Sequence, residues 1–176
     1  MQQHMIAMLD FVRAHQDFAA PIACLLAFGE SLALVSLLIP ATVMLIGIGA
    51  LIGASGIEFW PIYFGAVIGA GLGDWLSYWL GRHYHVQIAR LWPLSKNPDL
   101  LPKGHAFFEK WGWPGVFIGR FFGPLRAAVP LVAGTCGMPN LPFQIANWSS
   151  AFLWAALLLA PGSLGLSHLQ DVLSGF

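Results

Sequence analysis

Two arginines stand in one of the most apolar stretches of this chain, where they could bind an anion. Arg120 and Arg126 flank the dipeptide Gly123-Pro124. A guanidinium stays charged and presents a planar fork of N–H donors that matches the oxygens of a phosphate. A charge at the centre of a bilayer costs about 2.5–3.5 kcal/mol to insert, so unpaired arginines there would be costly. We therefore expect both arginines to have partners and to line a water-accessible site.

Two carboxylates in the first half of the chain are candidate partners for these arginines. Glu30 is the only charged residue in the segment 18–57, and Asp74 is the only one in the segment 59–81. A glutamate beside an arginine in a dry site could bind and release a proton near neutral pH, which makes Glu30 the better candidate for proton coupling. Asp74 could share that role or could join two helices by hydrogen bonds. Two compatible interpretations of the arginines follow: they hold an anionic ligand, or they neutralise the two acids in structural ion pairs.

Other polar residues support a binding site more than an enzyme. Asn147 is expected to hydrogen-bond a carbonyl of a broken helix, with substrate contact as the lesser option. His83 and His85 have the spacing of a metal pair, but beside Arg82 they are more typical of a membrane boundary. All six histidines lie outside or at the edges of the apolar segments, and no phosphate loop, zinc-spaced cluster or catalytic triad spacing is found. The sequence therefore predicts no metal, no cofactor and no enzyme activity.

The composition is that of an integral membrane protein. Of the 176 residues, 57% are hydrophobic and only 9% are charged, whereas soluble domains carry about 25% charged residues. The mean hydropathy is +0.71. The formal net charge is zero, which argues against a nucleic-acid partner. Five of the eight basic residues fall within 82–110, so the positive-inside rule predicts that this loop is cytoplasmic.

The apolar segments predict one all-α membrane domain over residues 1–176, built from two inverted repeats. In each repeat a hairpin broken by proline and glycine precedes a spanning helix, because proline cannot continue the helical ladder. Paired broken segments of this kind indicate a transporter with its substrate site between the repeats. The predicted elements are an interfacial amphipathic helix at 1–17, a re-entrant hairpin at 18–57 broken at Pro40, a transmembrane helix at 59–81, a loop with an amphipathic helix at 82–112, a second re-entrant hairpin at 113–138, and a transmembrane helix at 141–166 with a break at Pro161-Gly162.

The predicted helix at 59–81 carries two further patterns. Gly65, Gly69 and Gly73 repeat every four residues and form a flat face on which another helix can pack closely. This face could serve a homo-oligomer or an internal contact equally well. Aromatic residues near the basic end of the helix are typical of a belt at the membrane–water interface. They are Trp75, Tyr78, Trp79 and Tyr84.

The arginine segment resembles a family signature. Residues 119–134 read GRFFGPLRAAVPLVAG and are similar to the pattern G-R-F-x-x-P-x-R-x-x-x-P-x-x-A-G of the DedA family of bacterial membrane proteins, also called SNARE-associated or VTT-domain proteins. The resemblance extends over about residues 20–166. The other residues that match the family pattern are Glu30, Pro40, the segments 73–75 and 78–82, Phe143, Asn147 and Trp154.

The resemblance implies a multi-pass protein of the bacterial inner membrane with two facing re-entrant hairpins. Members of the family are similar to transporters that return undecaprenyl phosphate or other phospholipids across the membrane, and others are linked to proton-motive force and drug tolerance. This chain departs from the pattern at one position. Many members carry an acidic residue in a P-G-D or P-G-E element shortly after the glutamate, where this chain has Thr42. Threonine does not titrate near neutral pH, so either Asp74 takes that role or the coupling differs.

The sequence and the family resemblance together leave three functions open. The preferred hypothesis is a lipid transporter or flippase for undecaprenyl phosphate or a similar anionic lipid. In it, Arg120, Arg126 and Asn147 bind the substrate, while Glu30 and Asp74 couple its movement to protons. The second hypothesis is a proton-coupled exporter of small solutes or drugs. The third is a non-transporting protein that supports membrane organisation or a partner complex.

Overall fold

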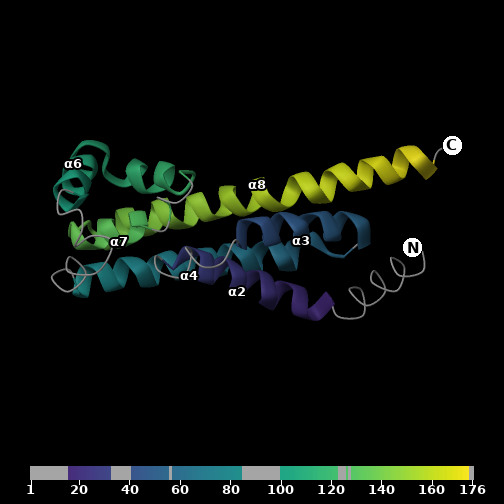
Figure 1. Cartoon of the computed structure of the whole chain (residues 1–176), viewed down its shortest axis with the longest axis horizontal. Helices are drawn as coiled ribbons and strands as arrows, with labels where there is room; N and C mark the ends of the chain where they lie inside the picture. Colours follow the sequence, from purple (N-terminus) through teal and green to yellow (C-terminus); the bar gives the residue numbers. More distant parts are fainter. Residues whose placement is uncertain are drawn as a thin grey trace.

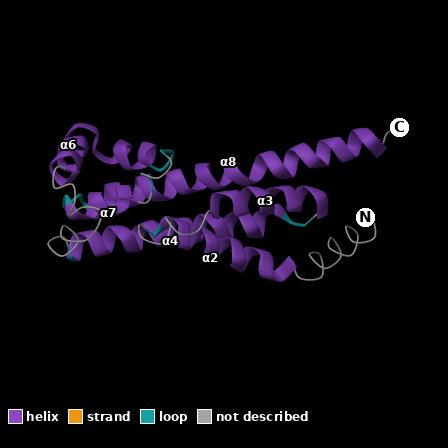
Figure 2. Ribbon diagram, in the orientation of Figure 1, coloured by secondary structure: helices purple, strands orange, loops and turns teal. Residues whose placement is uncertain are grey.

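The computed structural model describes residues 16–32, 41–55, 57–84, 100–122, 126 and 128–174. All regular structure in these ranges is helical (Figure 2), which confirms the predicted all-α class. The elements are the 3-10 helix η1 (Gln16–Phe18) and the α-helices α2 (Ala19–Ser31), α3 (Ala41–Ser55), α4 (Phe59–His83), α6 (Leu100–Gly119), α7 (Ala128–Thr135) and α8 (Asn140–Ser174). Apart from η1, the interfacial helix predicted at 1–17 lies outside the described residues, as do Pro40 and His85.

The helices run along one long axis of the molecule (Figure 1). The two longest are α4, with 25 residues, and α8, with 35 residues, and they contact each other. Helices α2 and α7 both pack on α4, while α3 and α6 both pack on α8. Helices α6 and α7 lie toward one end of the bundle and α2 and α3 toward the other (Figure 1). Helix α2 ends at Ser31 and α6 ends at Gly119, and neither continues into the next helix.

Helix α4 packs on α2 through the predicted glycine face. A Cβ atom added at Gly65 would lie 2.5 Å from the carbonyl oxygen of Ala20, and one at Gly73 would lie 2.7 Å from that of Phe28. At Gly69 the approach of the α2 backbone is closer still. Side chains larger than hydrogen would therefore push the two helices apart. The face serves an internal contact, which the sequence alone could not distinguish from a contact between subunits.

Both segments predicted as hairpins are interrupted between two helices. Helix α2 ends at Ser31, because Leu32 adopts extended backbone with φ −79° and ψ 123°, and α3 begins at Ala41, directly after Pro40. The second predicted segment, 113–138, is interrupted between the end of α6 at Gly119 and the start of α7 at Ala128. Before that interruption α6 bends at Gly112, where φ is 55° and ψ is −138°. Glycine adopts this left-handed conformation without a steric penalty. The amphipathic helix predicted within 82–112 corresponds to the part of α6 before this bend, and the part after it ends at Gly119.

Helix α8 continues through the position where the sequence predicted a break. The expected interruption at Pro161-Gly162 is wrong, because the helix is continuous from Asn140 to Ser174. Proline removes one helical N–H, but neighbouring helices and serine side chains can compensate in apolar helices. The missing side chain of Gly162 lets α8 lie directly on the backbone of α3, which keeps this part of the helix in line.

The aromatic belt predicted on α4 loses one member. Three of the four side chains are exposed: Trp75, Trp79 and Tyr84. Tyr78 is buried instead, and its hydroxyl donates to the carbonyl of Met138 at 2.6 Å. Its ring stacks on Phe143 with centroids 4.0 Å apart. Tyr78 therefore joins α4 to α8 and to the connection between α7 and α8.

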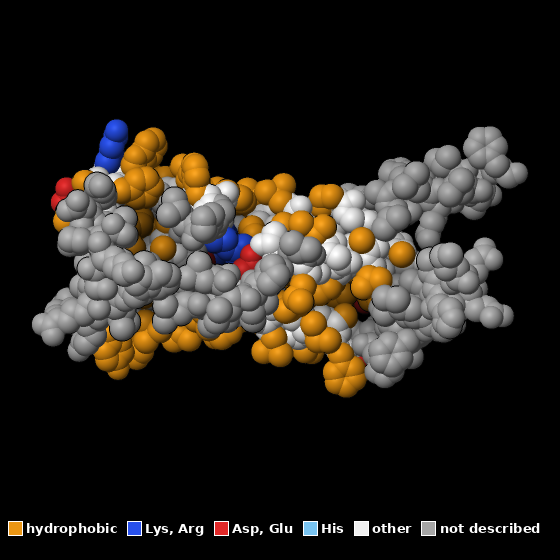
Figure 3. All heavy atoms as spheres, viewed as in Figure 1, with side chains coloured by type: hydrophobic (Ala, Val, Ile, Leu, Met, Phe, Trp, Pro, Cys, Tyr) orange, Lys and Arg blue, Asp and Glu red, His pale blue; other side chains and the backbone are white. Residues whose placement is uncertain are grey.

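The helices differ in whether they could cross a bilayer. Among the described residues, one helical stretch is long and apolar enough to do so, Asn140–Ser163 of α8, while α2 and residues Met44–Ala54 of α3 are shorter apolar helices. At 1.5 Å per residue, the 13 residues of α2 span about 20 Å, against about 30 Å for the hydrocarbon core. On the face seen in Figure 3, apolar side chains are spread over the described surface, and charged side chains are visible near its middle.

Candidate functional site

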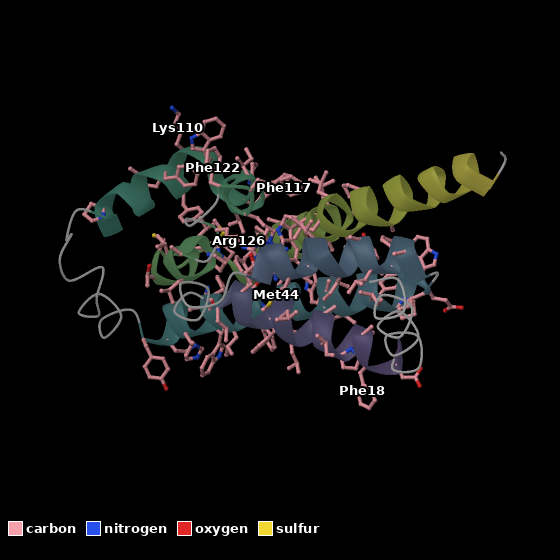
Figure 4. All side chains as sticks on the ribbon, turned by 45° about the vertical axis from the view of Figure 1, so that its right-hand side comes forward. Phe18, Met44, Lys110, Phe117, Phe122 and Arg126 are labelled. Atoms are coloured by element: carbon pink, nitrogen blue, oxygen red, sulfur yellow. The ribbon has the colours of Figure 1, made fainter. Side chains whose placement is uncertain are left out.

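Four charged residues meet inside the bundle, close to the two helix breaks. Glu30 lies in the last turn of α2, Asp74 within α4, Arg120 directly after α6, and Arg126 in the connection between α6 and α7. Glu30, Asp74 and Arg120 are each at most 6% exposed. Arg126 lies near the centre of the bundle, whereas Lys110 and Phe18 project from its outside (Figure 4). The predicted juxtaposition of both arginines with both acids is confirmed.

The first ion pair joins the end of α6 to α4 and α8. Nη2 of Arg120 donates to Oδ2 of Asp74 and, at 2.9 Å, to Oδ1 of Asn147. Nδ2 of Asn147 donates in turn to the carbonyl of Gly71 at 2.9 Å. We expected Asn147 to bond a carbonyl of a broken helix, and this was wrong because Gly71 lies within the continuous α4. The lack of a side chain at Gly71 makes room for the Trp148 ring of α8, which lets the two helices approach.

The second ion pair joins the connection between α6 and α7 to α2. Nη1 of Arg126 lies 3.0 Å from Oε1 of Glu30. The hydroxyl of Thr42, in the first turn of α3, donates to the same oxygen. The guanidinium carbon of Arg126 stands 4.4 Å from the centroid of the Trp154 ring, within the range of a cation–π interaction. Thr42 and Trp154 thus belong to the site. In the sequence, Thr42 stood out only as a departure from the family pattern, and Trp154 only as a match to it.

The charges of the four residues sum to zero, yet their hydrogen bonding is incomplete. Among the described residues, the buried atoms Glu30 Oε2 and Arg120 Nη1 have no hydrogen-bond partner, while the buried hydroxyl of Ser31 lies beside the carboxylate of Asp74. An unpaired buried donor or acceptor costs about 1–3 kcal/mol. Their location at the end of α2 and at the end of α6 marks a place where a polar group can bind. Sequence reasoning missed Ser31, because a serine in an apolar segment carries no distinctive signal.

The ion-pair interpretation of the arginines is confirmed, since each guanidinium has one carboxylate partner. The metal interpretation of His83 and His85 is not tested, because His85 lies outside the described residues. Within these residues no group of three His, Cys, Asp or Glu side chains could hold a metal ion. The exposed His83 has its Nδ1 3.1 Å from the carbonyl of Trp79 on its own helix. The arrangement can therefore present paired cations, exchangeable carboxylates and unpaired polar atoms to an anionic group.

Comparison with known proteins places this geometry in a family. The family model of the VTT domain matches residues 39–164 of this chain. The chain belongs to the VTT-domain family, also called the DedA family. The matched region contains both arginines, Asp74, Thr42 and Asn147. Most of the site is therefore built from the part of the chain that defines the family.

Relatives within the family are membrane proteins. The chain is 37% identical over 161 residues to the inner membrane protein YabI of Escherichia coli strain K12, covering 91% of this chain and 63% of YabI. It is 34% identical over 145 residues to an uncharacterized membrane protein of Buchnera aphidicola (strain Sg), with 82% and 58% covered. It is 31% identical over 128 residues to the inner membrane protein YqjA of Escherichia coli strain K12, with 70% and 57% covered.

The chain thus spans about three fifths of the length of these relatives. No solved structure matches it. The family assignment, together with the apolar composition, makes this chain a membrane protein of the VTT-domain family.

Proposed function

We propose that this protein moves an anionic lipid, undecaprenyl phosphate or a similar phospholipid, across the bacterial inner membrane in a proton-coupled manner. The observation that carries the proposal is the buried meeting of two arginines with two carboxylates beside two helix breaks. Charged side chains at membrane depth typically line a substrate or proton pathway. The relatives YabI and YqjA are named as inner membrane proteins, which supports the location.

The arrangement of the helices supports a transporter built from two inverted repeats. Helices α2 and α3 are each too short to cross a bilayer alone, so we assign them to one re-entrant hairpin, and the second part of α6 with α7 to another. Helices α4 and α8 are the spanning helices in this assignment. Irregular backbone at membrane depth is tolerated where it lines a cavity, and both breaks lie next to the charged site. The basic loop at 82–110 faces the cytoplasm in this topology.

The chemistry of the site suits a phosphate with an apolar tail. Nη1 of Arg120 has no partner among the residues that the structure describes, so it can donate to a phosphate oxygen without breaking the ion pair with Asp74. The exposed rings of Phe121 and Phe122 follow Arg120 directly and can contact the tail of the lipid. Asn147 contacts Arg120 and, by way of Gly71, fixes the position of the guanidinium on α4.

Charge neutrality of the site supports proton coupling. Because the charges of the four side chains sum to zero, a phosphate that enters the site adds net negative charge to a buried environment. That charge is offset if a carboxylate takes up a proton. Both carboxylates are paired with an arginine. Glu30 is the better candidate, because its Oε2 has no partner among the described residues and can receive the proton while Oε1 keeps its contact with Arg126.

Reconstitution into liposomes tests the proposal. Transbilayer movement of a labelled polyprenyl phosphate is measured for the wild type, Arg120→Ala and Arg126→Ala, with Lys110→Ala as the control that removes an exposed cation outside the site. We expect movement in the wild type and the control and its loss in both site variants. A wild type that moves lipid no faster than empty vesicles would refute the proposal. Proton-driven solute uptake without lipid movement would favour the exporter hypothesis instead.

A further inference from the structure

The helices fall into two groups according to how closely their backbones meet. In the first group, α4 holds both α2 and α7 by contact of backbone with backbone. The glycine face of α4 lies directly on the α2 backbone. Toward the other end of α4, a Cβ atom added at Gly81 would meet the carbonyl of Leu131 in α7, and one added at Gly134 of α7 would meet the carbonyl of Tyr78. At these points no side chain separates the three helices.

Helix α8 holds α3 in the same way. A Cβ atom added at Gly49 of α3 would lie 2.8 Å from the carbonyl oxygen of Leu159, and one added at Gly162 of α8 would meet the backbone of α3. Helix α6 also packs on α8, and Arg120, directly after α6, donates to Asn147 of α8. Helices α3, α6 and α8 therefore form the second group.

The glycines at the boundary between the two groups face side chains of the other group. Between α4 and α8, a Cβ atom added at Gly71 would lie 2.6 Å from the ring of Trp148. Between α6 and α7, one added at Gly104 would lie 2.5 Å from a methyl group of Val132. A side chain can change rotamer while two helices slide past each other, whereas a backbone carbonyl cannot. The boundary between the groups can therefore shift more readily than the contacts within them.

The polar contacts between the two groups gather at the charged site. A further contact, from the hydroxyl of Tyr63 to the carbonyl of Phe152, lies at the exposed surface. An anion or a proton that enters the site changes the electrostatic attraction across the boundary. Three contacts of the site join a residue of the first group to one of the second: Asp74 with Arg120, the carbonyl of Gly71 with Asn147, and Glu30 with Thr42.

We infer, building on the proposed function, that the protein works as two rigid units, α2–α4–α7 and α3–α6–α8, which shift against each other and are held together at the charged site. Successive helices of the described chain alternate between these units, so each predicted hairpin is divided between them. The inference differs from a motion of one repeat against the other, in which α2 would move together with α3. It also differs from a motion of the hairpins against the spanning helices, in which α2 would move away from α4.

Distances between paired spin labels, measured by electron paramagnetic resonance with the full chain in nanodiscs, test the inference. The native cysteines are replaced by Cys24→Ala and Cys136→Ala. Each label is attached to a cysteine that replaces an exposed residue, and the three pairs are Leu25 with Trp79 for α2 and α4, Ile46 with Leu141 for α3 and α8, and Leu25 with Ile46 for α2 and α3.

The pairs are compared with and without Asp74→Asn combined with Arg120→Gln, which removes both charges of one contact between the units. The α2–α3 distance should shift or broaden by about 2–5 Å, while the α2–α4 and α3–α8 distances stay unchanged. A change in the α3–α8 or the α2–α4 distance would overturn the inference, because the helices of one unit would then move apart. Three unchanged distances would overturn it as well.

A disulfide between the units tests the inference without altering the charged site. A Cβ atom at Gly104 would lie 3.9 Å from Cβ of Val132, within the range of about 3.5–4.5 Å that is typical of disulfides. Gly104→Cys with Val132→Cys, in the chain without native cysteines, should lose movement of a labelled polyprenyl phosphate in liposomes on oxidation and regain it on reduction. The reduced form of the same variant is the control.

Undiminished lipid movement by the fully oxidised variant would overturn the inference. A wild type that moves no lipid would count against the proposed function alone, because the label distances report the motion of the two units whatever the cargo.

Discussion

The ion pair between Arg126 and Glu30 allows the structural and the ligand-binding roles of the arginine to be separated. Its two atoms lie 3.0 Å apart, which corresponds to an attraction of about 5 kcal/mol at an effective dielectric constant near 20. The cost of burying both charges offsets much of this attraction. Removing one partner leaves the other charge buried and uncompensated, and this typically costs about 3–5 kcal/mol. Removing both charges avoids that cost.

We therefore expect a strongly non-additive double-mutant cycle for Arg126→Ala and Glu30→Gln. Arg126→Ala should lower stability by about 3–5 kcal/mol, because it strands a buried carboxylate. The combined variant should be more stable than Arg126→Ala by about 2 kcal/mol or more. Stability is measured by unfolding in mixed micelles with increasing amounts of a denaturing detergent. Transport is measured on the same preparations in liposomes.

The two measurements have different expected outcomes. If Arg126 binds the lipid, transport should remain lost in the combined variant although its stability recovers. Recovery of transport together with stability would show that Arg126 acts only through the ion pair. Additive losses of stability within about 0.5 kcal/mol would refute the reasoning from the pair, because groups that do not interact behave in that way. Lys110→Ala is the matched control and should change neither quantity.

Three further predictions concern the residues around the site. Gly69→Ala should destabilise the protein by about 1–3 kcal/mol, because the added methyl group meets the α2 backbone. Gly47→Ala has open space around its Cβ and should not destabilise it. Equal unfolding midpoints for the two variants would contradict the close contact between the helices. Trp154→Leu should reduce transport more than Trp154→Phe, because phenylalanine keeps a ring face for Arg126 and a cation–π interaction contributes about 0.5–2 kcal/mol; equal transport rates would argue that the ring acts by packing alone. Thr42→Val should lower the stability of the protein by about 1.5–3 kcal/mol, since it removes a hydrogen bond to a buried carboxylate. Unchanged unfolding in mixed micelles would show that this bond contributes little.

Several features of the fold could be predicted because they depend on local pattern. The four-residue repeat of glycine predicted a close helix contact, and α2 indeed lies against it. The insertion cost of isolated charges predicted that the arginines and the acids would be partners, as they are. The prolines differed as guides. Helix α3 begins directly after Pro40, whereas α8 continues through Pro161, because packing against α3 holds that part of α8 in a helix.

What the sequence by itself determined is therefore the kind of site: paired arginines and carboxylates in an apolar chain with broken helices. Only the tertiary structure decided which partners meet, since Arg120 pairs with Asp74 and Arg126 with Glu30. It also placed Thr42 and Ser31 at the site and moved Tyr78 from the surface to the interior. The physical reason is that the cost of a buried charge requires a partner but does not say which one. That choice depends on contacts between helices far apart in the chain, which no local periodicity encodes.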